Sequence, residues 1–147
     1  MYVHETRTRV RYIETDQMGV VYHANYLVYF EIGRTEYMRE IGLPYSSVEK
    51  EGLFFAVSEA QCSFRASARY DDVIVVRTHV KELTSVRLTF AYDVRKDEPG
   101  GEGKQLADGS TVLVCLNRDG KPTRIPDALA RRIAAADEGK VLHEEGP

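Results

Sequence analysis

The sequence of 147 residues is poor in cysteine, has no excess of positive charge and contains no long apolar run. Its two cysteines, Cys62 and Cys115, stand in apolar segments and form no C-x-x-C pair. A net charge of −3 does not indicate nucleic-acid binding, which usually involves a basic surface. No apolar stretch approaches the ~20 residues that a membrane-spanning helix needs, and residues 1–5 lack a signal-peptide pattern. We therefore expect a cytoplasmic protein with no membrane span and no nucleic-acid partner.

Several common catalytic motifs are also missing. The four histidines show no metal-ligand spacing, and no G-x-S-x-G motif is present to support a serine hydrolase. Gly101-Glu102-Gly103-Lys104 lacks the spacing and the following Ser or Thr of a phosphate-binding loop. We expect this segment to be a hairpin loop, and we expect neither a metal nor a cofactor.

What is present is the pattern of one long helix and five strands. Residues 2–12 alternate with a period of two, which predicts a strand with one charged face. Residues 22–41 carry apolar side chains at helical spacing, and Gly42 and Pro44 end this helix. Further strands are predicted near 59–65, 73–80, 87–94 and 105–117, and a short helix over 128–136. The long helix should bury one face made of Tyr26, Tyr29, Phe30, Gly33, Tyr37 and Ile41.

The order β-α-β-β-β-β predicts an α+β fold in one domain over residues 1–137, followed by a polar, frayed tail over 138–147. Five strands at ~4.8 Å spacing make a sheet about 20–25 Å wide, whereas one helix covers only ~10–12 Å. One helix can therefore hide one face only if the sheet curls around it. The other face and the sheet edges favour a second subunit, so we expect at least a dimer.

A loop containing Asp16 and Gly19 leads directly into the predicted long helix. The Asp16 carboxylate is ionised at neutral pH, and it can act as a nucleophile or as a general base. A helix N-terminus offers unpaired N–H groups and about half a positive charge, which suits a developing oxyanion. His23 lies seven residues after Asp16, and Gly19 relaxes the backbone between them. The alternative is that Asp16 only caps a turn.

The same loop carries a family resemblance. Asp16-Gln17-Met18-Gly19-Val20-Val21-Tyr22-His23-Ala24-Asn25-Tyr26 is similar to the signature D-x-x-G-[VI]-V-[YFW]-[HP]-x-N-Y of hot-dog-fold thioesterases, specifically the 4-hydroxybenzoyl-CoA thioesterase-like acyl-CoA thioesterases. Supporting matches are Tyr70-Asp71-Asp72, Asp108-Gly109-Ser110 and Gly120-Lys121-Pro122. One departure is Ser67, where the family usually has a proline.

The resemblance implies a hot-dog fold, in which an antiparallel sheet wraps one long helix and two subunits join their sheets, often as a dimer of dimers forming a homotetramer. It implies an acyl-CoA substrate, with an acyl carrier protein as the other carrier to consider, and CoA as part of the substrate. It further implies that Asp16 is the catalytic carboxylate and that a backbone N–H near His23 binds the thioester carbonyl oxygen.

The remaining candidates have weaker assignments. The His23 side chain steers water, assists departure of the thiolate, or only hydrogen-bonds locally. Tyr22 and Asn25 are candidate site residues that more simply shape the helix start, and Tyr26 is either core or part of an acyl pocket. Gly19 and Val20 complete the substrate-binding loop. The resemblance also directs attention to the turn after the third strand, where Ser85 and Arg87 are candidates for contacts with CoA; the alternative there is a solvated strand end.

Two other functions fit the same expected fold. A hot-dog dehydratase acts on 3-hydroxyacyl thioesters through a histidine and a carboxylate, and the arrangement expected around those residues is absent from this sequence. A non-catalytic module that binds acyl thioesters is the third possibility, although the intact Asp16 loop disfavours it. The acyl group and the choice between a covalent anhydride and a general-base mechanism stay open.

Overall fold

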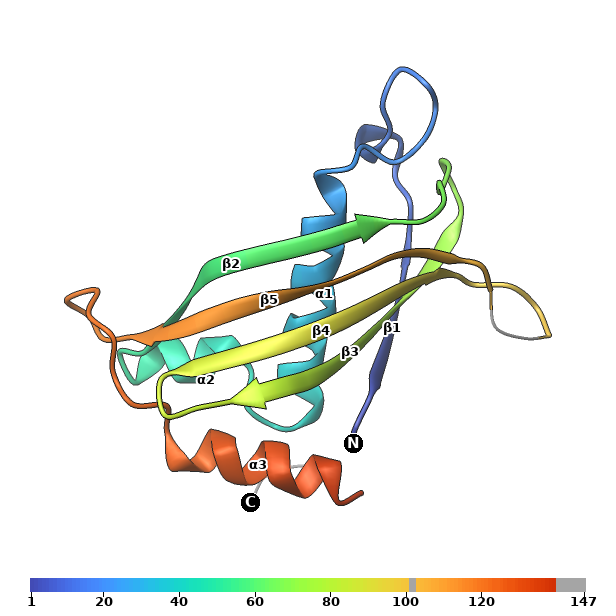
Figure 1. The fold of residues 1–147 in the computed structure, drawn as a ribbon. Helices are drawn as coiled ribbons and strands as arrows, with labels where there is room; N and C mark the ends of the chain where they lie inside the picture. The colour runs from blue at the N-terminus through green and yellow to red at the C-terminus, as the bar shows by residue number, and fades with distance from the viewer. Residues whose placement is uncertain (101–102, 140–147) are drawn as a thin grey trace.

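The computed structural model describes residues 1–100 and 103–139, which form one five-stranded antiparallel sheet and its helices. The strand order is β1-β3-β4-β5-β2, and the long helix α1 crosses one face of the sheet (Figure 1). The bounds are β1 His4–Arg9, η1 Tyr12–Glu14, α1 Asn25–Glu40, α2 Tyr45–Lys50, β2 Phe54–Phe64, β3 Val73–Leu83, β4 Arg87–Lys96, β5 Gln105–Leu116 and α3 Asp127–Asp137.

The core lies between α1 and the concealed face of the sheet. All six residues predicted for the buried face of α1 are buried, which confirms that prediction. Alternate residues of β4 meet this face, and the rings of Phe30 and Tyr92 stack with centroids 4.3 Å apart. Side chains repeat on one face every 3.6 residues in the helix and every 2 residues in the strand, so each element has one apolar face. These two apolar faces pack against each other.

The contact between α1 and β3 is closest at Gly33. A Cβ atom on Gly33 would lie 2.7 Å from Cγ1 of Val76 and would also collide with Oγ1 of Thr78. Both strand residues are fully buried and have no room to withdraw. The absence of a side chain at Gly33 thus sets how closely the helix approaches the sheet.

Several element boundaries differ from those predicted. The first strand ends at Arg9, and η1 follows it where the strand was expected to continue. β2 begins at Phe54, five residues before its predicted start. The polar connector contains the unpredicted helix α2, because Pro44 accepts a hydrogen bond from the Ser47 N–H and so opens a turn that buries Val48. Residues 140–147 of the predicted tail and residues 101–102 of the predicted hairpin loop lie outside the described residues.

The two edges of the sheet differ in character. The β1 edge alternates half-buried residues with exposed, charged ones. The β2 edge strand has 11 residues and is exposed along most of its length, including the apolar side chains Phe54, Val57 and Phe64. Leu27 and Val28 on α1 are also exposed apolar residues. Within residues 1–100 and 103–139, no helix is long and apolar enough to cross a membrane.

Replacing Gly33 by alanine should lower the free energy of unfolding by about 1–3 kcal/mol, because overpacking outweighs the ~1 kcal/mol gain in helix propensity. Urea unfolding followed by circular dichroism measures this loss. In a Thr78→Ala background one of the two obstructing atoms is gone, so the cost of Gly33→Ala should shrink. An equal cost in both backgrounds would contradict the proposed close contact.

Candidate functional site

The loop before α1 is a small hairpin held by backbone hydrogen bonds. The Tyr22 N–H donates to the Glu14 carbonyl oxygen at 2.9 Å, and the Asp16 N–H donates to the Val20 carbonyl oxygen at 2.8 Å. Gly19 closes the tip with a φ of +78°, a conformation that side-chain-bearing residues rarely adopt. Asp16 therefore lies opposite Val20, two residues or about 7 Å along the hairpin from the level of Tyr22.

Glu14 fastens this hairpin to the helix. Its carboxylate is buried and accepts hydrogen bonds from the Tyr29 hydroxyl (3.0 Å), the Arg11 N–H (2.9 Å) and the Arg11 Nε–H (3.0 Å). Its carbonyl oxygen accepts a further bond of 2.8 Å from Nδ2 of Asn25. The burial of Tyr29, reinforced by the Glu14 carboxylate, raises the pKa of Tyr29, so the hydroxyl remains a donor at neutral pH.

Two backbone N–H groups just before α1 have no backbone acceptor among the described residues. Asn25, Tyr26 and Leu27 donate to carbonyl oxygens of the preceding turn, whereas His23 and Ala24 donate to no backbone oxygen among the described residues. These two groups are the orphan donors expected at a helix N-terminus. With the positive end of the helix dipole they form a place for a developing negative charge.

Asp16 forms an Asx-turn and is half-buried. Its Oδ1 accepts hydrogen bonds from the Met18 N–H at 2.8 Å and the Val20 N–H at 3.4 Å. Oδ2 has no hydrogen-bond partner in the described part of the chain. The turn-forming alternative is therefore present in the geometry, and it leaves one carboxylate oxygen available for chemistry.

Aromatic rings surround the helix start. His23 is exposed, with its ring centroid 4.4 Å from that of Tyr22 and 6.1 Å from that of Phe64 at the end of β2. Tyr26 is buried, and its centroid lies 5.6 Å from that of Phe64. Burial, with the Asp108 carboxylate as a lesser cause, raises the pKa of Cys62 to about 11, so this thiol is not a nucleophile at neutral pH.

Ser85 and Arg87 do not join the Asp16 loop within one chain. Figure 1 shows the β3–β4 turn beside α3, at the opposite end of the molecule from the loop before α1. The Ser85 carbonyl oxygen accepts a 2.7 Å hydrogen bond from the Ile125 N–H. Arg87 is exposed and lines a different hollow together with Glu59 and Glu82. A role for either residue in binding the same substrate molecule would need a second subunit and stays a prediction.

The single chain leaves the site open. Neither Asp16 nor His23 lines any of five prominent cavities among the described residues. The described residues also contain no group of three or more metal-ligating side chains. Around the start of α1 the chain therefore provides the Asp16 carboxylate, the N–H groups of His23 and Ala24, and an aromatic surface.

Two contributors were not predicted from the sequence. Glu14 looked like an ordinary charged residue before the motif, although its position three residues after Arg11 is compatible with the local pair that they form. Phe64 was assigned only to a strand, because its meeting with His23 depends on the tertiary path of β2.

Comparison with known proteins gives consistent matches. The family described as the thioesterase-like superfamily matches residues 10–133. The Bacillus subtilis protein YneP, provisionally named an acyl-CoA thioesterase, is 33% identical over 141 residues, which are 95% of this chain and 99% of that protein.

Solved structures agree with these matches. A crystal structure of a hypothetical protein from Thermus thermophilus has 42% identity and a TM-score of 0.83, covering 92% of this chain and 99% of the other. The DHNA-CoA thioesterase of Staphylococcus aureus has 32% identity and a TM-score of 0.84, covering 97% and 98%. The expected hot-dog fold and the family resemblance are both confirmed.

Replacing Tyr29 by phenylalanine should lower the free energy of unfolding at pH 7 by about 1–3 kcal/mol, because the buried Glu14 carboxylate loses a donor. The raised pKa of Tyr29 adds stability that is fully present below the unfolded-state pKa near ~10 and is lost as the pH rises above it. The variant lacks this component, so its deficit should narrow above about pH 10.

Urea unfolding from pH 7 to 11 measures both effects. Tyr70→Phe serves as the matched control, because the Tyr70 ring is exposed. A deficit that is the same for both variants, or one that does not depend on pH, would contradict the role given to the pair of Tyr29 and Glu14.

Proposed function

The chain belongs to the thioesterase-like superfamily, and we propose that it hydrolyses acyl-CoA thioesters to the free acid and CoA, with Asp16 as the catalytic carboxylate. The observation that carries the proposal is that the Asp16 hairpin leads directly into the start of α1. Oδ2 of Asp16 is unpartnered within the described residues, and the nearby helix start offers the unpaired N–H groups of His23 and Ala24.

In the proposed reaction the thioester carbonyl oxygen binds at the helix start. The N–H groups there stabilise the negative charge that develops on the oxygen as the carbonyl carbon is attacked. Asp16 supplies Oδ2, either to remove a proton from an attacking water or to attack the carbon and form a mixed anhydride that water then opens. In both routes the C–S bond breaks and CoA leaves as a thiolate that is protonated.

The other residues have supporting roles in this proposal. The exposed His23 imidazole lies where it can meet the departing sulfur or orient water. Asn25 holds the hairpin to the helix through the Glu14 carbonyl oxygen. Tyr22 and Tyr26 form walls of the site, and Gly19 and Val20 form the substrate-binding loop beside it. The proposed reaction needs no cofactor, and CoA enters it as part of the substrate.

We further propose that a homodimer completes the site. The β2 edge is long and exposed, carries the exposed apolar side chains of Phe54 and Val57, and ends at Phe64 beside His23. An unpaired edge of this kind is a template for pairing with another strand. A second copy paired along β2 would bury Val57 with Leu27 and Val28 and place a wall beside Asp16, which lines no cavity among those described for the chain alone. Pairing of dimers into a tetramer stays a prediction.

Two details of the sequence-based expectation stay predictions within this proposal. An acyl carrier protein in place of free CoA would present the same thioester to the same donors. The cytoplasmic location likewise stays a prediction.

Asp16→Asn should lower kcat/KM for acyl-CoA hydrolysis by about 10²–10⁴-fold, because an amide is neither a base nor a nucleophile of comparable strength. Asparagine keeps an oxygen that can accept from the Met18 N–H, so the hairpin should persist. Release of CoA thiol from a panel of aromatic, short-chain, branched and long-chain acyl-CoAs measures the effect and identifies the preferred acyl group.

Asp71→Asn is the matched control, because Asp71 is an exposed aspartate in another turn. Hydrolysis by Asp16→Asn at the wild-type rate would overturn the catalytic assignment. Hydration of an enoyl-CoA without thiol release would indicate the dehydratase instead, and binding of acyl-CoA without any turnover would indicate the binding module.

Val57→Asp should convert the dimer to a monomer and abolish hydrolysis, because an unpaired charge would be buried in the new interface. Analytical ultracentrifugation gives the mass, and Lys81→Asp, an exposed position on β3, should leave it unchanged. A dimer that survives Val57→Asp with full activity would refute pairing along β2.

A further inference from the structure

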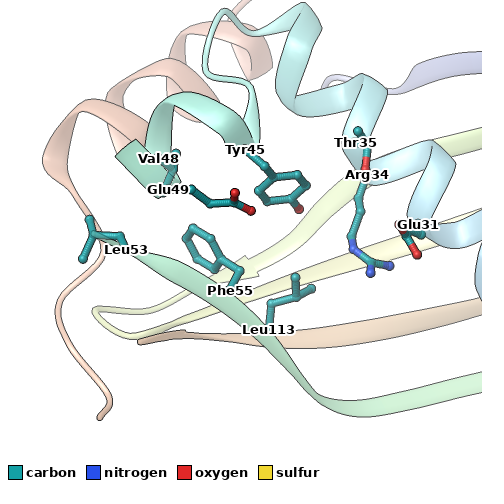
Figure 2. A pocket seen from close by; sticks show the side chains of 9 residues that line it. All are labelled: Glu31, Arg34, Thr35, Tyr45, Val48, Glu49, Leu53, Phe55 and Leu113. Atoms are coloured by element: carbon teal, nitrogen blue, oxygen red, sulfur yellow. The ribbon is translucent and has the colours of Figure 1, made fainter. Parts of the chain in front are cut away.

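A cavity beside the middle of α1 is separate from the Asp16 loop. It lies between α1, α2, β2 and β5 and has a volume of about 160 Å³, well above the ~10–15 Å³ that one water needs. Figure 2 shows Arg34 entering it from α1 and Tyr45 from α2. Arg34 is nine residues beyond the first residue of α1, or about 13 Å along the helix axis.

One hydrogen-bond donor in this cavity lacks an acceptor among the described residues. The Tyr45 hydroxyl oxygen is buried and has no hydrogen-bond partner among the described residues. Burial raises the pKa of Tyr45, against the opposing effect of the nearby Arg34 guanidinium, so the hydroxyl keeps its proton at neutral pH. A buried donor without an acceptor is unfavourable, and bound ligand would remove this penalty.

The Arg34 guanidinium is half-buried, and no carboxylate of the described chain lies within ion-pairing distance of it. It lies near the hydroxyl oxygens of Tyr45 and Tyr92, which can accept from two of its N–H groups, and the Tyr92 hydroxyl is also bonded to Oγ1 of Thr111 at 2.5 Å. Arginine is always charged and presents its N–H groups as a planar fork that matches a carboxylate. The fork and the Tyr45 hydroxyl therefore require the same kind of partner, an oxygen acceptor.

The rest of the lining fixes the other properties of the ligand. Val48, Leu53, Phe55 and Leu113 form an apolar wall, and the Phe55 ring lies beneath that of Tyr45, with centroids 6.2 Å apart. The lining also includes two carboxylates, and Figure 2 shows that of Glu49 beside Tyr45 and that of Glu31 beside Arg34. Both residues are exposed, so water screens their charges more strongly than that of the half-buried Arg34.

We propose that this cavity is a binding site for a small carboxylate with an apolar or aromatic body. The carboxylate accepts hydrogen bonds from the Arg34 guanidinium and the Tyr45 hydroxyl, and the body packs against Phe55 and Leu113. The site is distinct from the Asp16 loop, and its occupancy does not depend on the proposed hydrolysis.

Benzoate is the probe, with benzamide as its neutral counterpart, and binding to the full chain is measured by NMR titration and calorimetry. Benzoate should bind saturably and more tightly than benzamide. Arg34→Gln should weaken benzoate binding about ten- to hundredfold and Tyr45→Phe about tenfold, because each removes a charge-assisted hydrogen bond. Arg39→Gln on the same helix is the matched control, since Arg39 is exposed and paired with Glu36, and it should bind as the wild type does.

Three further variants distinguish failure of this binding proposal from failure of the hydrolytic proposal and from loss of folding. Asp16→Asn should bind benzoate unchanged, so failure of the hydrolytic proposal and failure of this one give different results. Glu49→Gln should tighten binding, because a negative charge at the rim is removed. Tyr45→Phe should fold with undiminished stability, because it removes a hydroxyl that has no partner among the described residues. Equal affinity for benzoate and benzamide, weaker binding in Glu49→Gln, or no effect of Arg34→Gln would each overturn the proposal.

Discussion

The Glu14 carboxylate is the buried charge on which the arrangement of this end of the molecule depends. Removing an ionised group from water is costly unless hydrogen bonds replace the lost hydration. Arg11 and Tyr29 provide those bonds, one from the preceding turn and the other from the second turn of α1. The carbonyl oxygen of Glu14 accepts hydrogen bonds from the Tyr22 N–H and from Nδ2 of Asn25. One residue thus joins three segments, and the orientation of the loop relative to the helix start follows from it.

The helix and the sheet supply the rigid support for this junction. Gly33 allows α1 to lie directly on β3, and the stacked rings of Phe30 and Tyr92 fix the helix against β4. Leu27 and Val28 on α1, and Val57 on β2, remain exposed on the isolated chain. α1 therefore contributes one face to the core and another, with Leu27 and Val28, to the proposed subunit interface.

The sequence predicted most of the fold because its elements carry strong periodic patterns. The buried face of α1 and the alternation along β4 could be read directly, and the motif around Asp16 located the loop and the family. The short helix α2 was missed because Pro44 was read only as a stop signal, although proline also suits the first turn of a helix. Glu14 was missed for a different reason. A buried charge is recognisable only when its partners are known, and one of them, Tyr29, lies fifteen residues away.

The Asx-turn at Asp16 makes the two oxygens of its carboxylate inequivalent. The Met18 N–H holds Oδ1, so a half rotation about the Cβ–Cγ bond would have to break that hydrogen bond before the oxygens could exchange places. The plane of the carboxylate is consequently set by the backbone of the hairpin and not by free torsion of the side chain. The hairpin would thus present the reactive oxygen of Asp16 from one constant direction, and an incoming molecule must approach from that side.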